Sequence, residues 1–87
     1  MRQIIKTAPF QAEYVSFAAE FARAGEFITG AEYSLGRNPY LGDEIQGNPP
    51  VRIYRFFDVR GKKNAVLYYT FDENRVIFLS IRLSDRS

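Results

Sequence analysis

The side chains of this sequence that could do chemistry are arginines, lysines and tyrosines in its second half. Residues 51–87 carry eight Arg or Lys against four Asp or Glu, a net charge of +4, whereas residues 1–50 carry four against six, a net charge of −2. A guanidinium binds phosphate through two parallel hydrogen bonds, and a tyrosine ring stacks on an unpaired base. The basic half therefore favours an anionic partner, with nucleic acid first and an acidic protein segment second.

The residue types that the sequence lacks narrow the chemistry further. It has no Cys and no His, which excludes disulfides, thiolate nucleophiles, imidazole catalysis and the common zinc sites. It has no Walker loop, no dinucleotide-binding glycine motif and no carboxylate set with metal spacing, so we expect no metal and no other cofactor. Since no apolar run approaches a membrane span and Met1–Lys6 is too short and polar for a signal peptide, we expect a cytoplasmic protein without membrane contact.

Three predicted strands carry most of these side chains. β-Branched and aromatic residues dominate Val51–Phe57, Ala65–Phe71 and Arg75–Leu83, and turn residues separate the three segments. The second break, Asp72-Glu73-Asn74, is short enough to require an antiparallel hairpin. A three-stranded antiparallel meander is therefore predicted for the second half of the chain.

Side chains alternate between the two faces of a strand, and this alternation assigns a face to each charge. In the third strand one face is predicted to be core: Ile77, Leu79, Ile81 and Leu83. Arg82 shares the opposite face with Phe78, and in the first strand Arg52 and Arg55 fall on opposite faces. At least one Arg therefore lies over a mixed surface, either as a solvated side chain whose stem covers the sheet or as part of a ligand-binding face of Arg, Tyr and Phe.

The residues before this sheet are predicted to cover it. The apolar pair in Arg2–Lys6 predicts a short strand that joins the sheet. Thr7 as a cap and Pro9 near the first helical position predict the start of a helix. Apolar residues then follow at helical spacing and should face the core: Phe10, Tyr14, Phe17, Ala18 and Phe21.

A second helix should complete a helical hairpin. Ala24-Gly25 predicts the break, the second helix should run from about Glu26 to Leu35, and Gly36 should end it. Residues 38–50, rich in Pro, Gly, Asn and Asp, are expected to run over the surface. The fold predicted for residues 1–87 is a single α+β domain, in which a short N-terminal strand and a two-helix hairpin pack on one face of a small antiparallel β-sheet with four strands in all. Its core is predicted to be Phe10, Tyr14, Phe17, Phe21, Leu35, Ile77, Leu79 and Ile81.

A motif closes the predicted helical hairpin, and three further pieces follow it in order along the chain. The four are Asn38-Pro39-x-x-Gly42, a strand with Arg52 and Arg55, then Tyr69-Thr70-Phe71-Asp72, then residues 76–81. In this order, over nearly the whole chain, they resemble the RelE/ParE superfamily of toxins from type II toxin–antitoxin modules. Two positions depart from the RelE-like pattern: Val66 stands where an Arg is common, and the sequence has no terminal Tyr after its last basic residues.

The resemblance implies a site that cleaves mRNA. Attack of a ribose 2′-hydroxyl on the adjacent phosphate needs a base, a proton donor for the leaving oxygen, and positive charge at the phosphorane. The candidate catalytic residues are Arg52, Lys62, Tyr69 and Arg82, and the candidate nucleic-acid-binding residues are Arg55, Arg60, Lys63 and Arg86. Tyr68 is an alternative to Tyr69 for stacking a base or donating a proton. Core packing is the ordinary alternative role for these tyrosines, and a solvated hairpin tip is the ordinary alternative for the two lysines.

The resemblance also implies partners, and it leaves three functions open. The first is a toxin that cleaves mRNA on the ribosome and is neutralised by a cognate antitoxin protein. The second is a ParE-like protein that blocks DNA gyrase by contact, without nuclease chemistry. The third is a degenerate member that binds only its antitoxin or nucleic acid. The two departures at Val66 and at the terminal Tyr favour the second and third functions, whereas the basic, aromatic sheet favours the first.

Overall fold

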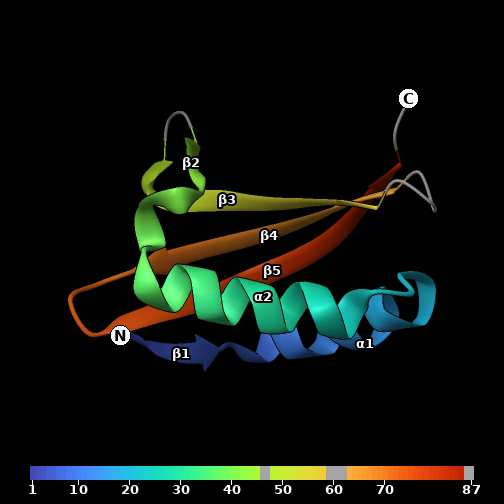
Figure 1. Cartoon of the computed structure of the whole chain (residues 1–87), viewed down its shortest axis with the longest axis horizontal. Coiled ribbons are helices and arrows are strands. Elements are labelled where there is room, and N and C mark those ends of the chain that lie inside the picture. The colour runs from blue at the N-terminus through green and yellow to red at the C-terminus, as the bar shows by residue number, and fades with distance from the viewer. Residues whose placement is uncertain (46–47, 59–62, 86–87) are drawn as a thin grey trace.

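Two helices cover one face of a five-stranded mixed β-sheet in the computed structural model, which describes residues 1–45, 48–58 and 63–85 (Figure 1). The spatial order of the strands is β1-β5-β4-β3-β2. The strands are β1 (Gln3–Lys6), β2 (Asp43–Ile45), β3 (Asn48–Asp58), β4 (Lys63–Phe71) and β5 (Arg75–Asp85). The helices are α1 (Ala8–Glu20) and α2 (Ala24–Arg37), and a short 3₁₀ turn, η1 (Pro39–Leu41), follows α2. The predicted α+β class is confirmed.

The sheet is built around the predicted meander, with one added strand at each edge. β3, β4 and β5 pair in antiparallel fashion, so the three predicted strands are confirmed. β1 is also confirmed, but it pairs with β5 in parallel, with Ile4 opposite Val76, so the sheet is mixed. The prediction of four strands was wrong because β2 lies in the expected surface connection. Its residues Asp43 and Glu44 carry no strand signal, and they pair because the edge of β3 supplies hydrogen-bonding partners.

A β-bulge in β5 changes the face to which its side chains point. Tyr68 lies opposite Ser80, whereas the next residue, Tyr69, lies opposite Phe78. Leu79 is therefore an extra residue with no partner of its own in this register, as in a bulge. Side chains before and after Leu79 that face the same side of the sheet are consequently separated by an odd number of positions.

The bulge explains which predicted core residues are buried and which are not. The buried apolar residues are Phe10, Phe17, Phe21, Ala24, Phe27, Ile28, Ala31, Leu35, Ala65, Leu67, Tyr69, Val76, Phe78 and Ile81. The core prediction is right for Ile81 and wrong for Ile77 and Leu79, which are only half-buried because the alternation shifts at the bulge. Tyr14 is half-buried at the edge of the core, and Ala18 of the predicted stripe is exposed.

The start of α1 is the predicted one. The Thr7 hydroxyl oxygen accepts a hydrogen bond from the Phe10 amide at 3.3 Å, which satisfies one of the free donors of the first turn. The same hydroxyl donates to the carbonyl oxygen of Phe78 at 2.9 Å. Thr7 therefore caps the helix and fixes its start against β5.

The break between the helices falls three residues earlier than predicted. α1 ends at Glu20, and Phe21 turns into the core, where its ring packs on Phe17 with 5.0 Å between ring centroids. Burial of this ring sets the turn, so Gly25 lies inside the first turn of α2 and breaks no helix. α2 also continues beyond the predicted end to Arg37, with Gly36 buried in its last turn.

Candidate nucleic-acid interface

The face of the sheet opposite the helices has no covering element among the described residues, and we call it the open face. Both helices lie on the other side (Figure 1), where Phe27 of α2 stacks on Tyr54 and Phe10 of α1 packs on Phe78. Strand alternation and register then place the following side chains on the open face: Val51, Ile53, Arg55, Phe57, Asn64, Val66, Tyr68, Thr70, Arg75, Ile77, Leu79, Ser80, Arg82 and Ser84. The open face is thus largely apolar and aromatic, with Arg55 and Arg82 beside Val66 and Arg75 at the β4–β5 turn.

Two of these arginines flank one valine in a row across the sheet. Arg55 of β3 lies opposite Val66 of β4, and Val66 lies opposite Arg82 of β5. Because adjacent strands lie about 4.8 Å apart, the backbones of Arg55 and Arg82 are separated by roughly 10 Å. Their side chains are 60% and 67% exposed, respectively. Both guanidinium groups can therefore reach one polyanion that lies across the strands.

Both arginines of the row are held by weak, exposed ion pairs. Nη1 of Arg55 lies 2.8 Å from Oδ2 of Asp43, on the neighbouring strand β2. Nε of Arg82 lies 3.9 Å from Oε2 of Glu13 and 3.4 Å from Oγ of Ser80. Exposed ion pairs of this kind contribute about 0–1 kcal/mol. A phosphate that binds to either arginine would therefore displace a carboxylate with little loss of stability.

A hollow beside this row could hold a base. It has a volume of about 370 Å³ and is lined by Ile45, Val51, Tyr68, Leu79, Ser80 and Arg82. Tyr68 lies between Ile53 and Ser80 in the next row of the sheet, with its ring half-buried. An aromatic ring at the wall of a hollow, with a guanidinium beside it, is the arrangement that proteins use to hold an unpaired base and its phosphate.

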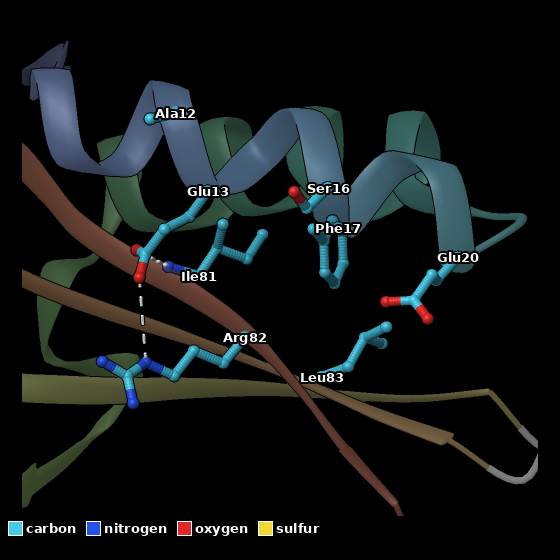
Figure 2. Close-up of a pocket in the computed structure, with 8 residues that line it drawn as sticks. All are labelled: Ala12, Glu13, Ser16, Phe17, Glu20, Ile81, Arg82 and Leu83. Atoms are coloured by element: carbon cyan, nitrogen blue, oxygen red, sulfur yellow. Dashed lines mark hydrogen bonds and ion pairs between the residues drawn. The ribbon is translucent and has the colours of Figure 1, made fainter.

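Arg82 also borders a groove between α1 and β5, which Figure 2 shows. The groove has a volume of about 540 Å³, and Glu13 reaches across it from α1 to β5. Oε1 of Glu13 accepts hydrogen bonds from the Ser80 hydroxyl at 2.7 Å and from the Ile81 amide at 3.2 Å. Glu20 lies at the other end of the groove (Figure 2). Two carboxylates against one guanidinium make this groove unsuitable for phosphate.

Glu13 also closes part of the outer edge of β5. β1 pairs with β5 only from Arg75 to Phe78, so the edge beyond Phe78 has no strand partner in the described part of the chain. The Ile81 amide on this edge finds its acceptor in the Glu13 carboxylate. A side-chain acceptor at an edge strand blocks pairing with another chain.

Tyr69 lies on the helix-covered face and is fully buried. Its hydroxyl donates to the carbonyl oxygen of Pro39 at 2.6 Å and accepts from the Gly42 amide at 2.9 Å. Burial raises the pKa of this hydroxyl above its ordinary value of 10.0. Tyr69 therefore fixes the connection between α2 and β2, and its hydroxyl is not accessible to a substrate.

Arg52 holds the same connection from the neighbouring position on β3, directly opposite Tyr69. Its Nε donates to the carbonyl oxygen of Gly42 at 3.1 Å, and its Nη1 lies 3.4 Å from Oε1 of Glu44. Gly42 has no room for a side chain, because a Cβ atom there would lie 2.5 Å from the Ile53 carbonyl oxygen and 2.5 Å from the Tyr69 hydroxyl. The close approach of three chain segments explains why glycine stands at this position of the Asn38-Pro39-x-x-Gly42 motif.

The structure thus divides the predicted site residues between two faces. Arg55 and Arg82 come together on the open face, whereas Arg52 and Tyr69 lie on the helix-covered face. Lys63 begins β4 opposite Asp58, away from both groups. Arg60, Lys62 and Arg86 lie outside the described residues.

Sequence reasoning did not find the two carboxylates that hold the arginine row, Asp43 and Glu13. Asp43 comes from the unpredicted strand β2, and Glu13 comes from a helix whose contact with β5 is known only from the tertiary structure. No local pattern identifies either residue.

Two comparisons with known proteins were made, one with family models and one with curated proteins. No protein-family model matches the sequence, and no curated protein matches it either. Within residues 1–45, 48–58 and 63–85, neither helix has the length and apolarity that a membrane crossing requires, and no three acidic side chains gather as a metal ion would need.

Proposed function

We propose that this chain is the toxin of a type II toxin–antitoxin module and that it acts on mRNA through the open face. The row Arg55–Val66–Arg82, beside Tyr68 and its hollow, carries this proposal. It presents two exposed cations and one aromatic ring on a face without a helix. The order of the elements and the Asn38-Pro39-x-x-Gly42 motif add support through their resemblance to RelE/ParE toxins.

In the proposed reaction the arginines supply electrostatic stabilisation. Attack of a 2′-hydroxyl on the adjacent phosphate builds negative charge on the equatorial oxygens. A strand that crosses the row Arg55–Val66–Arg82 would bring this phosphate within reach of both guanidinium groups. Tyr68 stacks the base beside the scissile bond. The 2′-oxygen forms a bond to phosphorus while the bond from phosphorus to the 5′-oxygen breaks, which leaves a 2′,3′-cyclic phosphate. Lys62, which lies outside the described residues, remains the candidate from the sequence for the base that takes the 2′-hydroxyl proton, and water protonates the departing 5′-oxygen.

The test is cleavage of a translated mRNA in a reconstituted system, with Arg82→Ala and Arg55→Ala compared with wild type. Removal of a cation aimed at the phosphorane should lower the cleavage rate by on the order of 10²-fold for Arg82→Ala. Arg23→Ala is the matched control, because Arg23 is also exposed and ion-paired but lies at the start of α2. Urea midpoints of all three variants should equal that of wild type. Full cleavage and full growth inhibition by Arg82→Ala would remove Arg82 from the site.

A ParE-like function is the second candidate, and the division of the predicted catalytic residues favours it. Arg52 and Tyr69 are occupied by the backbone of Pro39 and Gly42, so the open face lacks both. A gyrase supercoiling assay run beside the cleavage assay separates the candidates. Inhibition of supercoiling without cleavage assigns the gyrase function, and activity in neither assay assigns a degenerate member that binds only antitoxin or nucleic acid.

The antitoxin of such a module should bind on the same open face. The carboxylates of an acidic, partly disordered segment would pair with Arg55 and Arg82. The apolar side chains of that segment would pack on the apolar side chains between the two arginines. Co-expression with the protein encoded next to this chain should restore growth, and Arg55→Ala with Arg82→Ala should weaken the complex. Harmless expression of this chain alone, with no binding by any neighbouring small protein, would argue against the module.

A further inference from the structure

Guanidinium groups and aromatic rings alternate at one end of the helix-covered face. The Arg2 guanidinium carbon lies 5.6 Å from the ring centre of Phe71, and Phe71 meets Tyr40 edge to face with 4.9 Å between centroids. The guanidinium carbon of Arg52 lies 5.4 Å from the Tyr40 ring centre. Nearby, Arg37 lies 5.2 Å from the ring of Tyr33. We call these residues the Arg–aromatic cluster: Arg2, Tyr33, Arg37, Tyr40, Arg52 and Phe71.

Three guanidinium groups, those of Arg2, Arg37 and Arg52, lie over aromatic rings in this cluster. The main chain also brings their elements together, since the Arg2 amide donates to the Gly36 carbonyl oxygen at 2.9 Å beside Arg37. The cluster is therefore an organised surface.

Tyr40 is the exposed centre of this surface. Its side chain lies on Arg52, whose own side chain is only 15% exposed, while Tyr40 itself is 63% exposed. The ring therefore lies against the guanidinium and against Phe71, while most of the Tyr40 surface remains in solvent. Its backbone is fixed as well, because Oδ1 of Asn38 accepts from the Tyr40 amide at 3.2 Å. Tyr40 is thus an exposed aromatic residue whose backbone is held in place.

Two cations of the cluster have no carboxylate partner among the described residues. Nε of Arg2 donates to the backbone carbonyl oxygen of Asp72 at 2.8 Å. Nη1 of Arg37 donates to the hydroxyl of Tyr33 at 2.8 Å. The carboxylates of Glu44 and Asp72 are engaged instead by Arg52 and Arg75. Arg2 and Arg37 thus leave positive charge without a carboxylate partner close to the exposed Tyr40. The same hairpin carries the carboxylate of Asp72, paired with Arg75, and the exposed carboxylate of Glu73.

We propose that the Arg–aromatic cluster is a second nucleic-acid site, which binds a single strand by stacking an unpaired base on Tyr40 and holding the flanking phosphates with Arg2 and Arg37. Stacking on an exposed ring and cationic contacts to the backbone are the two components of single-strand binding. The cluster lies on the helix-covered side, so it is separate from the open face and does not depend on cleavage there.

The test is fluorescence anisotropy with a short unstructured 2′-O-methyl RNA oligonucleotide, which lacks the attacking hydroxyl, and with DNA of the same sequence. Tyr40→Ala should weaken binding roughly tenfold or more, while Tyr40→Phe keeps the ring and should bind as wild type. Arg37→Ala should reduce the salt dependence by about one phosphate contact. Equal binding of both oligonucleotides indicates contact to backbone and base alone, and a preference for the RNA form adds a contact to the ribose.

Matched variants keep the result specific to this surface. Arg23→Ala removes another cation that lies over a ring, that of Phe56, but at the opposite end of the helices, and should leave binding unchanged. Arg82→Ala tests the open face in the same assay. In a protein that carries both substitutions, Tyr40→Ala should still weaken binding. The proposal is overturned if Tyr40→Ala binds as wild type with an unchanged urea midpoint, or if Arg23→Ala weakens binding as much as Arg37→Ala.

Discussion

The Tyr69 hydroxyl donates a hydrogen bond of 2.6 Å to the carbonyl oxygen of Pro39, on a turn thirty residues earlier in the chain. Replacement of Tyr69 by Phe leaves that carbonyl and the Gly42 amide buried without partners. Each such group costs about 1–3 kcal/mol, so we expect a clear fall in the free energy of unfolding measured with urea. Tyr68→Phe is the matched control, since Tyr68 is half-buried on the open face, and it should change stability little.

The same residue should shape the alkaline limb of the stability curve. Burial raises the pKa of Tyr69 in the folded protein above 10.0, so the unfolded chain loses its proton first as pH rises. The contribution of Tyr69 to the free energy of unfolding is therefore fully present below the pKa that Tyr69 has in the unfolded chain. It is lost as pH rises through the pKa that Tyr69 has in the folded protein. Wild type should therefore lose stability above about pH 10 more steeply than Tyr69→Phe, and parallel curves would contradict this.

Two glycine substitutions should have opposite signs. Gly42→Ala forces a Cβ atom to within 2.5 Å of the Ile53 carbonyl oxygen and the Tyr69 hydroxyl, which should lower the free energy of unfolding by about 1–3 kcal/mol. Gly30 lies in α2 with nothing within 4 Å of the added atom. Gly30→Ala should therefore raise the free energy of unfolding by about 0.5–1 kcal/mol, because alanine favours the helix more than glycine does. Thermal or urea unfolding measures both, and equal effects would show that Gly42 is not crowded.

The bulge in β5 predicts unequal losses for neighbouring leucine and isoleucine residues. Ile81→Ala empties a buried position and should cost about 2–5 kcal/mol. Leu79→Ala removes a half-buried side chain on the open face and should cost about 1 kcal/mol. If urea unfolding showed the larger loss for Leu79→Ala, β5 would be regular and its alternation unbroken.

The β4–β5 hairpin should weaken in acid. The Arg75 side chain, with the amides of Asn74 and Arg75, holds the pKa of Asp72 at about 2, below its ordinary value of 3.8. A lowered folded pKa gives stability that is present above pH 3.8 and is lost as pH falls through about 2. Asp72→Asn should show a smaller loss of stability over this window, and Glu73→Gln, one residue along, should behave as wild type.

Most of the fold can be predicted from strand alternation and helix capping, which depend on local residue types. The three strands of the meander and the cap at Thr7 follow from local residue types, which the structure confirms. The exceptions depend on distant contacts. The turn between the helices is set by burial of Phe21, and β2 forms only because β3 offers it an edge.

For the candidate site, alternation alone already separates Arg52 from Arg55. Assigning Tyr69 and Arg82 correctly needed two further facts: the connection that covers Tyr69, and the bulge at Leu79. The bulge leaves no mark in residue type, because Leu79 and Ile81 are equally suited to a core. The Arg–aromatic cluster could not be predicted from the sequence, because its members come from five separate elements or turns that meet only in the folded protein.

β1 and β5 are neighbours in the sheet although they lie near opposite ends of the chain, with Gln3 opposite Arg75. During synthesis the first strand therefore has no partner until residues 75–78 have been made, and contacts between distant residues form late. The row Arg55–Val66–Arg82 also forms only after β5 has been made, because Arg82 belongs to that strand. A ribosome that makes this protein thus carries a nascent chain in which neither the sheet edge nor the arginine row exists, and both are assembled only when β5 is complete.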